Sequence, residues 1–381
     1  TALPVCAARK SAPATAVSTA RWAARGMRVT VLKLGSLFDG IGVFPLAAVH
    51  CGIEPVWASE IEARPISITR RHFPDMLHLG DITKISGAEI PPVDVITFGS
   101  PCQDLSQIGT RNGFAGKKSS LFYQAMRIIE EMRYATNGRY PAFTVWENVA
   151  GAFSSNDRLD FAAMLSAFTG AEVSVPPRGW AHAGMVRGGC ADTAWRLLDA
   201  QYWGEPALAQ RRKRVFVVAD FAGQRAGEVL FKPRTVLPFS AIGGPGGLPA
   251  TARGGVSAAQ TGRQVPIVRP FSLRRMRTMA QVGDQKGFCA SFGRGGEPFP
   301  TLLASVTAPF SFWYEGEERD GFLRVLTPLE CERLMGLPEN WTKYGCKNEE
   351  ISNHARYRAL GNSIALPCAE YVMAGIAEVM N

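Results

Sequence analysis

Val93-Asp-Val-Ile-Thr-Phe98 is a short apolar stretch that leads directly into Gly99-Ser-Pro-Cys-Gln103. A run of this length and apolarity predicts a strand buried on both faces, as in a parallel sheet. Because ligands of open α/β sheets bind beyond the carboxyl ends of the strands, Cys102 is placed to act as a nucleophile. A lone buried cysteine is more often a small apolar filler, so the rest of the chain must decide between the two interpretations.

The sequence around this stretch alternates between apolar strands and helices. Strands are predicted at Val29–Leu34, Glu54–Ser59, Val93–Phe98, Phe143–Trp146 and Arg214–Ala219. Helices are predicted at Val43–His50, Ala63–His72, Ser120–Arg133, Leu159–Phe168, Thr327–Met335 and Ser363–Met380. This alternation is typical of an α/β fold, in which helices cover both faces of a largely parallel sheet.

Composition limits the classes of protein to be considered. Hydrophobic residues make up 46% of the chain and charged residues 20%, as in an ordinary globular protein. No run of about 18 apolar residues occurs, so no membrane span is expected. The eight cysteines form no Cys-x-x-Cys pair and the five histidines lack metal-ligand spacing. We therefore expect no metal site, no disulfide framework and a cytoplasmic location.

Positive charge is concentrated in one internal segment. Residues 225–314 carry eleven basic and three acidic side chains, within a chain of net charge +9, and residues 242–256 are dense in Gly and Pro. A loop-rich lobe that binds a polyanion and a solvated charged loop both fit this charge. We predict a disordered or non-native extension at 1–28, a catalytic domain at 29–224, a second, smaller domain at 225–322 and a segment at 323–381 that rejoins the first domain.

A glycine turn, Phe38-Asp-Gly40-Ile-Gly42, connects the first predicted strand to the first helix. It lets a ligand approach the backbone and face the amides of a helix N-terminus, although a purely structural turn fits equally well. Glu60 follows the second strand, where a carboxylate accepts hydrogen bonds from ribose hydroxyls, and Asp81-Ile82 follows the next segment. Because the third glycine of the dinucleotide pattern is missing, a nucleoside ligand is favoured over NAD.

Three later segments also allow two interpretations each. Glu147-Asn148-Val149 ends a strand, so Glu147 is either an acid with a raised pKa or an exposed helix cap. Gln210, Arg212 and Arg214 alternate onto one face of a strand, where they serve a site or protect a sheet edge. Gly361-Asn-Ser363 begins the last predicted helix, where Asn and Ser are also common caps.

In their order along the chain, these segments closely resemble the motifs of the cytosine-5 DNA methyltransferase family. The resemblance runs from about residue 31 to the C-terminus and omits only the basic segment, where the family has a variable target-recognition domain. It implies a Rossmann-like S-adenosylmethionine-dependent methyltransferase sheet with a second, smaller loop-rich target-recognition domain. It also implies methylation of carbon 5 of a flipped-out cytosine after covalent addition of Cys102 to carbon 6.

The resemblance assigns further roles residue by residue. The implied catalytic residues are Cys102, Gln103, Glu147, Asn148, Arg212 and Arg214. The residues implied to contact S-adenosylmethionine are Phe38, Gly40, Gly42, Glu60, Ile61, Asp81, Ile82, Pro101, Leu121, Asn362 and Ser363. Candidate DNA contacts are Ser106, Arg111, Lys117, Lys118, Arg274, Arg275, Arg277 and Thr301.

The expected partner is double-stranded DNA, bound by a monomeric enzyme of bacterial or phage type. The family includes the modification halves of restriction–modification systems, which have a cognate endonuclease, and orphan phage enzymes. Two alternatives are a tRNA cytosine-5 methyltransferase and a catalytically silent DNA-binding protein. The absence of a Cys-Phe-Thr element argues against the first, and the intact Cys102, Glu147 and Arg212 argue against the second.

Overall fold

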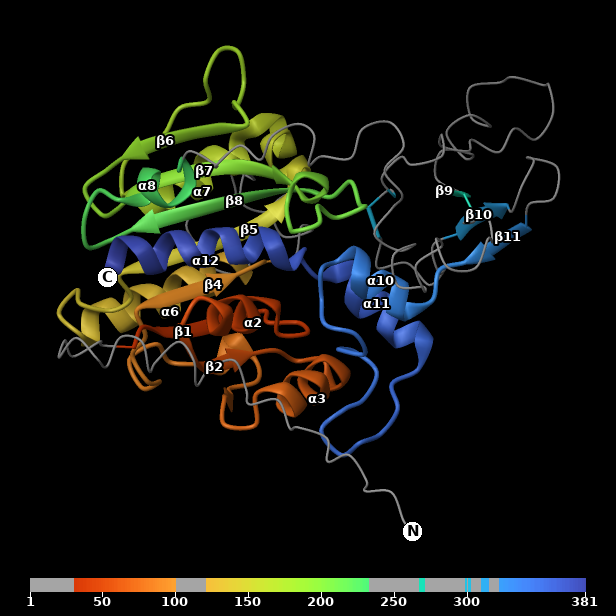
Figure 1. Ribbon diagram of the computed structural model, residues 1–381. Helices are drawn as coiled ribbons and strands as arrows, with labels where there is room; N and C mark the ends of the chain where they lie inside the picture. The colour runs from red at the N-terminus through yellow and green to blue at the C-terminus, as the bar shows by residue number, and fades with distance from the viewer. Residues whose placement is uncertain are drawn as a thin grey trace, which may run out of the picture.

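Eight strands pair into one mixed sheet in the order β3-β2-β1-β4-β5-β8-β7-β6 (Figure 1). The computed structural model describes residues 31–100, 121–232, 299, 301–302 and 325–381 in full, and the backbone alone at 267–270, 310–314 and 322–324. The strands of this sheet are β1 (Lys33–Leu37), β2 (Glu54–Ser59), β3 (Leu77–His78), β4 (Val95–Phe98), β5 (Phe143–Val149), β6 (Ala183–Arg187), β7 (Asp192–Asp199) and β8 (Lys213–Asp220).

The sheet consists of a parallel half and an antiparallel half. Strands β3, β2, β1, β4 and β5 run parallel to one another, whereas β8, β7 and β6 each run antiparallel to the strand before them. Strand order reverses between β1 and β4, which creates the crevice where ligands of such sheets bind. The predicted α/β fold is confirmed, although β6 and β7 were not foreseen in the sequence.

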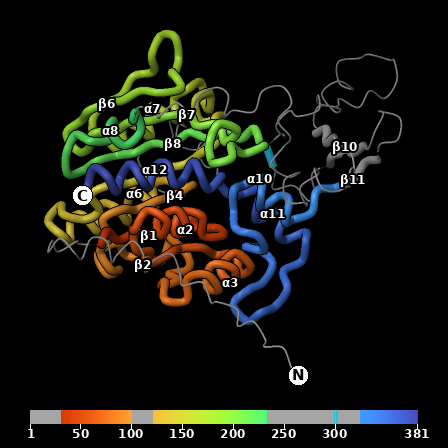
Figure 2. The backbone as a smooth tube through the Cα atoms, viewed as in Figure 1, coloured from red at the N-terminus to blue at the C-terminus, as the bar shows by residue number. Residues whose placement is uncertain are grey.

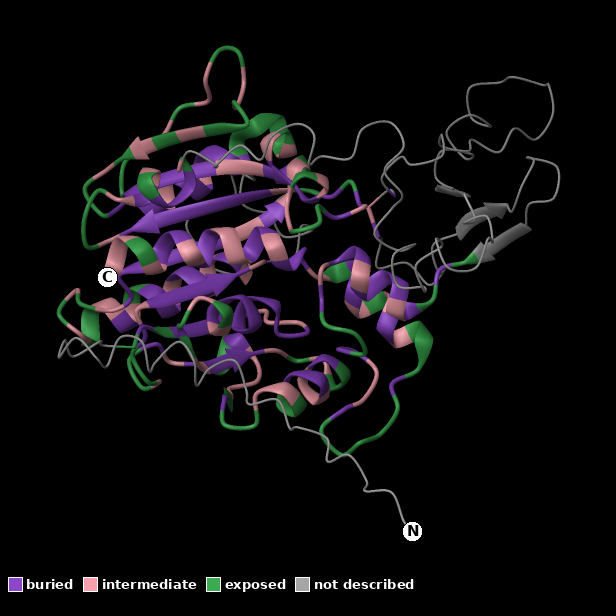
Figure 3. Cartoon of the chain, viewed as in Figure 1, coloured by how far each residue is buried: buried purple, intermediate pink, exposed green. Residues whose placement is uncertain are grey.

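Helices cover both faces of the sheet and enclose two cores. The helices are α2 (Val43–His50), α3 (Ala63–His72), α6 (Leu121–Ala135), α7 (Leu159–Thr169), α8 (Ala226–Leu230), α10 (Pro328–Leu334), α11 (Asn353–Asn362) and α12 (Leu366–Met380). Helices α2, α8 and α12 contribute to one core, and α6 and α7 to the other. The central strands are buried along most of their length (Figure 3).

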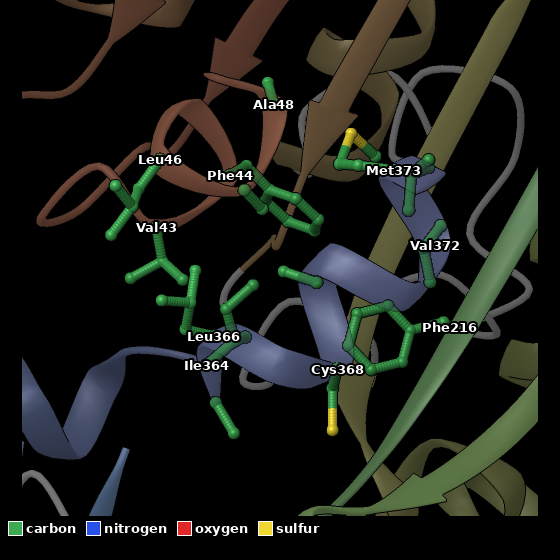
Figure 4. Close-up of a cluster of buried hydrophobic side chains, with 14 of the residues drawn as sticks. Val43, Phe44, Leu46, Ala48, Phe216, Ile364, Leu366, Cys368, Val372 and Met373 are labelled. Atoms are coloured by element: carbon green, nitrogen blue, oxygen red, sulfur yellow. The ribbon is translucent and has the colours of Figure 1, made fainter. Parts of the chain in front are cut away.

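The last helix packs against the first one described. The tube trace shows α12 beside α2 although they lie at opposite ends of the chain (Figure 2). Ile364 and Leu366 pack against Val43 and Leu46 in this core (Figure 4). The C-terminal segment therefore rejoins the first sheet, and it brings residues 361–366 to the start of α2.

Several predicted boundaries were wrong. Strand β1 begins at Lys33 rather than Val29, because pairing with β2 and β4 on both sides fixes its register. Residues Gly361–Ser363 end α11 instead of starting the last helix, which begins at Leu366 with Pro367 in its first turn. Helix α8, which follows the domain boundary predicted at residue 225, packs on α12 in the main core.

The described strands of the second region form a separate small sheet. Strands β9 (Ile267–Pro270), β10 (Phe310–Tyr314) and β11 (Phe322–Val325) pair antiparallel in the order β11-β10-β9. In the described part of the chain no cluster of His, Cys, Asp and Glu could hold a metal ion. None of the described helices is by itself long and apolar enough to span a membrane; α11 and α12 reach that composition only as a pair bent by 43°.

Candidate active site

Positive φ angles shape the glycine turn that follows β1. Phe38, Gly40 and Gly42 have φ angles of 53°, 59° and 78°, so the chain needs glycine or a strained residue at three positions. A Cβ atom at Gly40 would meet nothing within 4 Å, which leaves the backbone open to close approach. Gly42 ends the turn as the residue before α2. The predicted glycine turn therefore exists at the carboxyl end of β1, in the crevice of the sheet.

Glu60 holds this turn in place from the end of β2. Its carboxylate accepts hydrogen bonds from the amides of Gly40 (2.9 Å), Ile61 (2.7 Å) and Glu62 (2.9 Å). A carboxylate has room for about four hydrogen bonds, so one further donor such as a ribose hydroxyl can still be accepted. The neighbouring Ile61 is 72% exposed, which makes it an apolar surface beside the turn.

Trp341 braces the same turn from the C-terminal segment. Its indole Nε1 donates to the carbonyl of Ile41 at 2.8 Å, and the His72 ring stacks on the indole at 3.6 Å. His72 Nε2 lies 2.8 Å from the Trp341 carbonyl oxygen, and burial lowers the pKa of this histidine. No local pattern predicts this contact, since Trp341 lies about 300 residues from the turn.

Asp39 is a buried carboxyl that the sequence analysis did not single out. Both of its carboxylate oxygens are buried, and neither accepts a well-formed hydrogen bond from a described residue. Burial raises its pKa to about 7; the Ser36 and Thr69 hydroxyls oppose this shift, and the charge of Glu60 adds to it. A charged residue inside a glycine turn was the one available signal, but only the fold reveals its burial.

Replacement of Asp39 by asparagine is expected to remove a pH dependence of stability. Because the folded-state pKa is raised from 3.8 to about 7, the native carboxyl contributes most below pH 3.8, and its contribution falls as pH rises to about 7. The variant should therefore be more stable than wild type at pH 8, by at most about 4 kcal/mol, and this difference in the free energy of unfolding should be smaller at pH 5. Urea unfolding at both values measures this, with exposed Asp75→Asn as control. A difference independent of pH would contradict the assignment.

The predicted cofactor positions Asp81 and Ile82 differ in how far a ligand can reach them. Asp81 follows β3, and its side chain accepts from the amide (3.0 Å) and hydroxyl (2.8 Å) of Thr83, which lowers its pKa. Ile82 is 4% exposed and belongs to the hydrophobic core, so little of it is available to a ligand. Of the other predicted cofactor positions, Asn362 is exposed at the end of α11, and Ser363 and Leu121 are half-buried.

Acidic and basic side chains meet where β4, β5 and β8 come together. Glu147 lies within β5, opposite Phe216, and Val149 pairs with Arg214. Since β8 runs antiparallel to β5, its first residues lie at the edge where the parallel strands end. Arg214 Nε is 3.0 Å from Glu147 Oε1, an ion-pair distance at an angle that does not form an aligned hydrogen bond.

Burial and neighbouring charges act in opposite directions on the pKa of Glu147. Its side chain is 12% exposed, and burial raises its pKa, while the positive charges of Arg214 and Arg212 oppose the shift. A Cβ atom at Gly99 would lie 3.2 Å from Glu147 Oε2, so only a glycine leaves this space to the carboxylate. The carboxyl therefore lies directly against the turn that leads to Cys102.

Asn148 and Trp146 fix the same turn from the opposite face of β5. Asn148 Nδ2 donates to the Ser100 carbonyl at 3.1 Å, and Trp146 Nε1 donates to the Ser100 hydroxyl at 3.2 Å. All three residues are buried. Ser100 is two residues from Cys102, so these bonds set where the chain emerges from β4. No motif in the sequence marks Trp146 as a residue that holds this turn.

Arg212 and Gln210 are both fully buried rather than presented to a cleft. The Arg212 side chain donates to backbone carbonyls, as described below, and burial together with Arg214 lowers its pKa to about 9, with Glu147 opposing. Neither the side-chain nitrogen nor the side-chain oxygen of Gln210 has a hydrogen-bond partner among the described residues. The predicted strand that aligned Gln210, Arg212 and Arg214 begins only at Lys213.

Some predicted site residues lie outside the described part of the chain. These are Pro101, Cys102, Gln103, Ser106, Arg111, Lys117, Lys118, Arg274, Arg275 and Arg277, together with residues 1–28. Thr301 is described, and its hydroxyl donates to the Arg211 carbonyl at 2.6 Å. The roles of all these residues stay predictions.

Comparison with known proteins gives consistent matches over most of the chain. The family model described as C-5 cytosine-specific DNA methylase matches residues 32–231 and 274–378. A DNA N-6-adenine-methyltransferase of Escherichia phage P1 is 24% identical over 90% of this chain, which spans 60% of that relative's length. The type II methyltransferase M.BsuFI of Bacillus subtilis is 25% identical over 93% of this chain and 74% of its own length.

Solved structures share the architecture. The Dnmt2 methyltransferase of S. pombe aligns with 92% of this chain and 100% of its own, with a TM-score of 0.54 at 16% sequence identity. At this identity the likeness concerns the fold alone. It confirms the predicted Rossmann-like methyltransferase sheet.

Proposed function

We propose, because this chain belongs to the C-5 cytosine-specific DNA methylase family, that it methylates carbon 5 of a cytosine within a specific duplex DNA sequence. One observation carries the proposal beyond the family match. The buried Glu147–Arg214 pair lies against the turn at Gly99 and Ser100, two residues before the predicted nucleophile Cys102. An acid with a raised pKa and a cation therefore lie against the chain that leads to the predicted nucleophile, which supports this proposal.

S-adenosylmethionine is the methyl donor that this family implies, and the glycine turn fits it. Gly40 leaves its backbone open, and Glu60 retains capacity for a ribose hydroxyl. Phe38, Gly40, Gly42, Glu60, Ile61, Asn362 and Ser363 would hold the donor. When bound, it supplies a methyl group on a positively charged sulfur, from which a carbon nucleophile can take it.

The protein's own residues then activate the base. The Cys102 thiolate adds to carbon 6 of cytosine, and the electron pair moves to carbon 5, which takes the methyl group. Glu147 donates a proton or hydrogen bond to ring nitrogen 3 and so stabilises the negative charge that addition creates. A base removes the carbon 5 proton, and the returning electron pair expels the thiolate. Arg214 keeps Glu147 in position throughout.

Duplex DNA is the substrate that the charge distribution supports. The segment with eleven basic and three acidic residues lies where the family recognises its target, and it neutralises phosphate charge. A cytosine inside a duplex must be flipped out of the stack to reach the pocket, at a cost of a few kcal/mol. The type II relative supports a modification role, paired with a restriction endonuclease.

Identification of the methylated base tests this function. Labelled S-adenosylmethionine is incubated with mixed-sequence duplex DNA, and the digested nucleosides are separated. We expect label in 5-methylcytosine, and bisulfite sequencing of the product then gives the recognised sequence. Label in N6-methyladenine would instead favour the activity named for the phage P1 relative. A parallel incubation with tRNA in place of DNA completes the test: label in tRNA alone, or in neither nucleic acid, would contradict the proposal.

A further inference from the structure

The guanidinium of Arg212 lies at the meeting point of three chain segments. The residue is 1% exposed, and its side chain donates to the backbone carbonyls of Leu302 (2.9 Å), Gly361 (2.9 Å) and Ser363. Its own backbone amide donates to Asp199 Oδ1 at 3.0 Å. Because the Arg212 side chain donates only to backbone oxygens in the described residues, these hydrogen bonds depend on where the segments lie and not on which side chains they carry.

Each of these segments belongs to a different part of the proposed function. Leu302 directly follows Thr301, a predicted DNA contact in the second region. Gly361 and Ser363 flank Asn362, so the guanidinium holds both sides of a predicted cofactor position. Two residues further along the chain, Arg214 pairs with Glu147 in the base pocket. One side chain therefore touches the DNA side and the cofactor side of the enzyme.

The segment on the DNA side also bonds to the neighbours of Arg212. The Phe299 carbonyl accepts a hydrogen bond from the Arg211 amide (2.7 Å), and the Phe299 amide donates to the Ala209 carbonyl (2.7 Å). Phe299 therefore lies alongside residues 209–211, and a movement of the segment at Phe299 and Leu302 would act on the chain at Arg212. On the cofactor side, Gly361 lies in the last turn of α11, where carbonyls lack helical partners and attract a cation.

The guanidinium cannot keep its hydrogen bonds to Leu302 and to Gly361 and Ser363 if these two segments move independently. It is planar, with donors in a fixed fork, and a buried donor that loses its acceptor is costly. Burial and the charge of Arg214 lower the pKa of Arg212 to about 9, so its charged form lies in surroundings that penalise a charge left without acceptors. Movement at Leu302 must therefore be passed to Gly361 and Ser363, or a buried bond must break.

We propose that Arg212 is a positioning residue that couples DNA binding to cofactor binding, in place of the catalytic role that the family resemblance implied. This inference rests on the proposed function. Thermodynamic linkage requires the coupling to be reciprocal: the duplex changes the affinity for cofactor by the same factor as cofactor changes the affinity for the duplex.

Calorimetry on the full chain tests the coupling. The dissociation constant of S-adenosylhomocysteine is measured with and without a short duplex that carries the sequence methylated in the assay above. For wild type we expect the two values to differ by at least about fivefold, in the range typical of coupled sites. In Arg212→Met the ratio should fall to within about twofold of one, and Arg212→Lys, which keeps the charge but not the fork, should lie between them.

A control variant and the ratio itself separate coupling from a loss of folding. Arg211→Met alters the adjacent exposed arginine and should keep the wild-type ratio. A variant that is destabilised but still fully folded under the conditions of the titration, as its unfolding curve shows, should keep the wild-type ratio, because its binding sites are unchanged. A wild-type ratio of one, or a wild-type ratio retained in folded Arg212→Met or Arg212→Lys, would overturn the inference. Failure of wild type to bind cofactor or duplex would instead count against the proposed function.

Discussion

Replacement of Cys102 by alanine is expected to lower methyl transfer to duplex DNA by at least about 10³-fold, as loss of the nucleophile does in other covalent enzymes. Carbon 5 of cytosine becomes reactive only after a thiolate has added to carbon 6, and alanine has no group that can form that bond. Binding of S-adenosylmethionine should remain, because its predicted contacts lie in the glycine turn. Single-turnover kinetics with labelled cofactor measure the rate, and calorimetry measures the binding.

A matched cysteine and a trapping substrate make this result specific. Cys190 is an exposed free thiol at the far edge of the sheet, and Cys190→Ala should keep wild-type activity. Duplex DNA with 5-fluorocytosine at the target should form a denaturant-resistant adduct with wild type, since fluorine cannot leave as a proton. The adducted peptide should contain Cys102. Turnover by Cys102→Ala at more than a tenth of the wild-type rate would rule out the covalent route.

The second large effect is expected at Glu147. Replacement by glutamine should lower the rate of methyl transfer by about 10²- to 10⁴-fold, the usual contribution of a positioned acid. Burial raises the pKa of this carboxyl, so a larger share stays protonated near neutral pH than in an exposed glutamate. As pH rises through that raised pKa, the proton is lost and the wild-type rate should decline.

The pH profile distinguishes this role from simple damage to the pocket. In Glu147→Gln the decline of rate with rising pH should disappear, because the amide does not titrate, although the rate stays low at every pH. Glu130→Gln changes an exposed glutamate on α6 and should leave rate and profile unaltered. A loss of less than tenfold in Glu147→Gln, or an unchanged profile, would show that another group supplies the proton.

The sequence predicted those parts of the fold that local pattern decides. Strand β2 (Glu54–Ser59) and helices α2 and α3 lie where their apolar pattern and flanking residues placed them. The family resemblance is confirmed by the match over residues 32–231 and 274–378. Errors occurred where the contacts that form an element come from residues distant in sequence. Strands β6 and β7 were not predicted, and they form because β7 pairs with β8 and β6 pairs with β7. Helix α11 was not predicted either, and the last helix begins at Leu366 and not at Ser363.

In the candidate site too, the sequence identified residues, and the fold determined their contacts. Glu147 and Arg214 were named from their spacing, but their ion pair depends on β8 running antiparallel to β5, which no local pattern reveals. Arg212 has the same residue type and nearly the same position as Arg214, yet it is buried among backbone carbonyls. Asp39, Trp146 and Trp341 carry no motif of their own, and they matter because of what surrounds them.

The amino-acid sequence by itself determined the family, the order of the elements and the residue types available for chemistry, because motifs and apolar periods are properties of neighbouring residues. Only the tertiary structure decided which charges pair, which carboxyls are buried and which arginine joins the DNA side to the cofactor side. Those properties arise from desolvation and from contacts between segments up to about 300 residues apart, and the folded chain alone creates them.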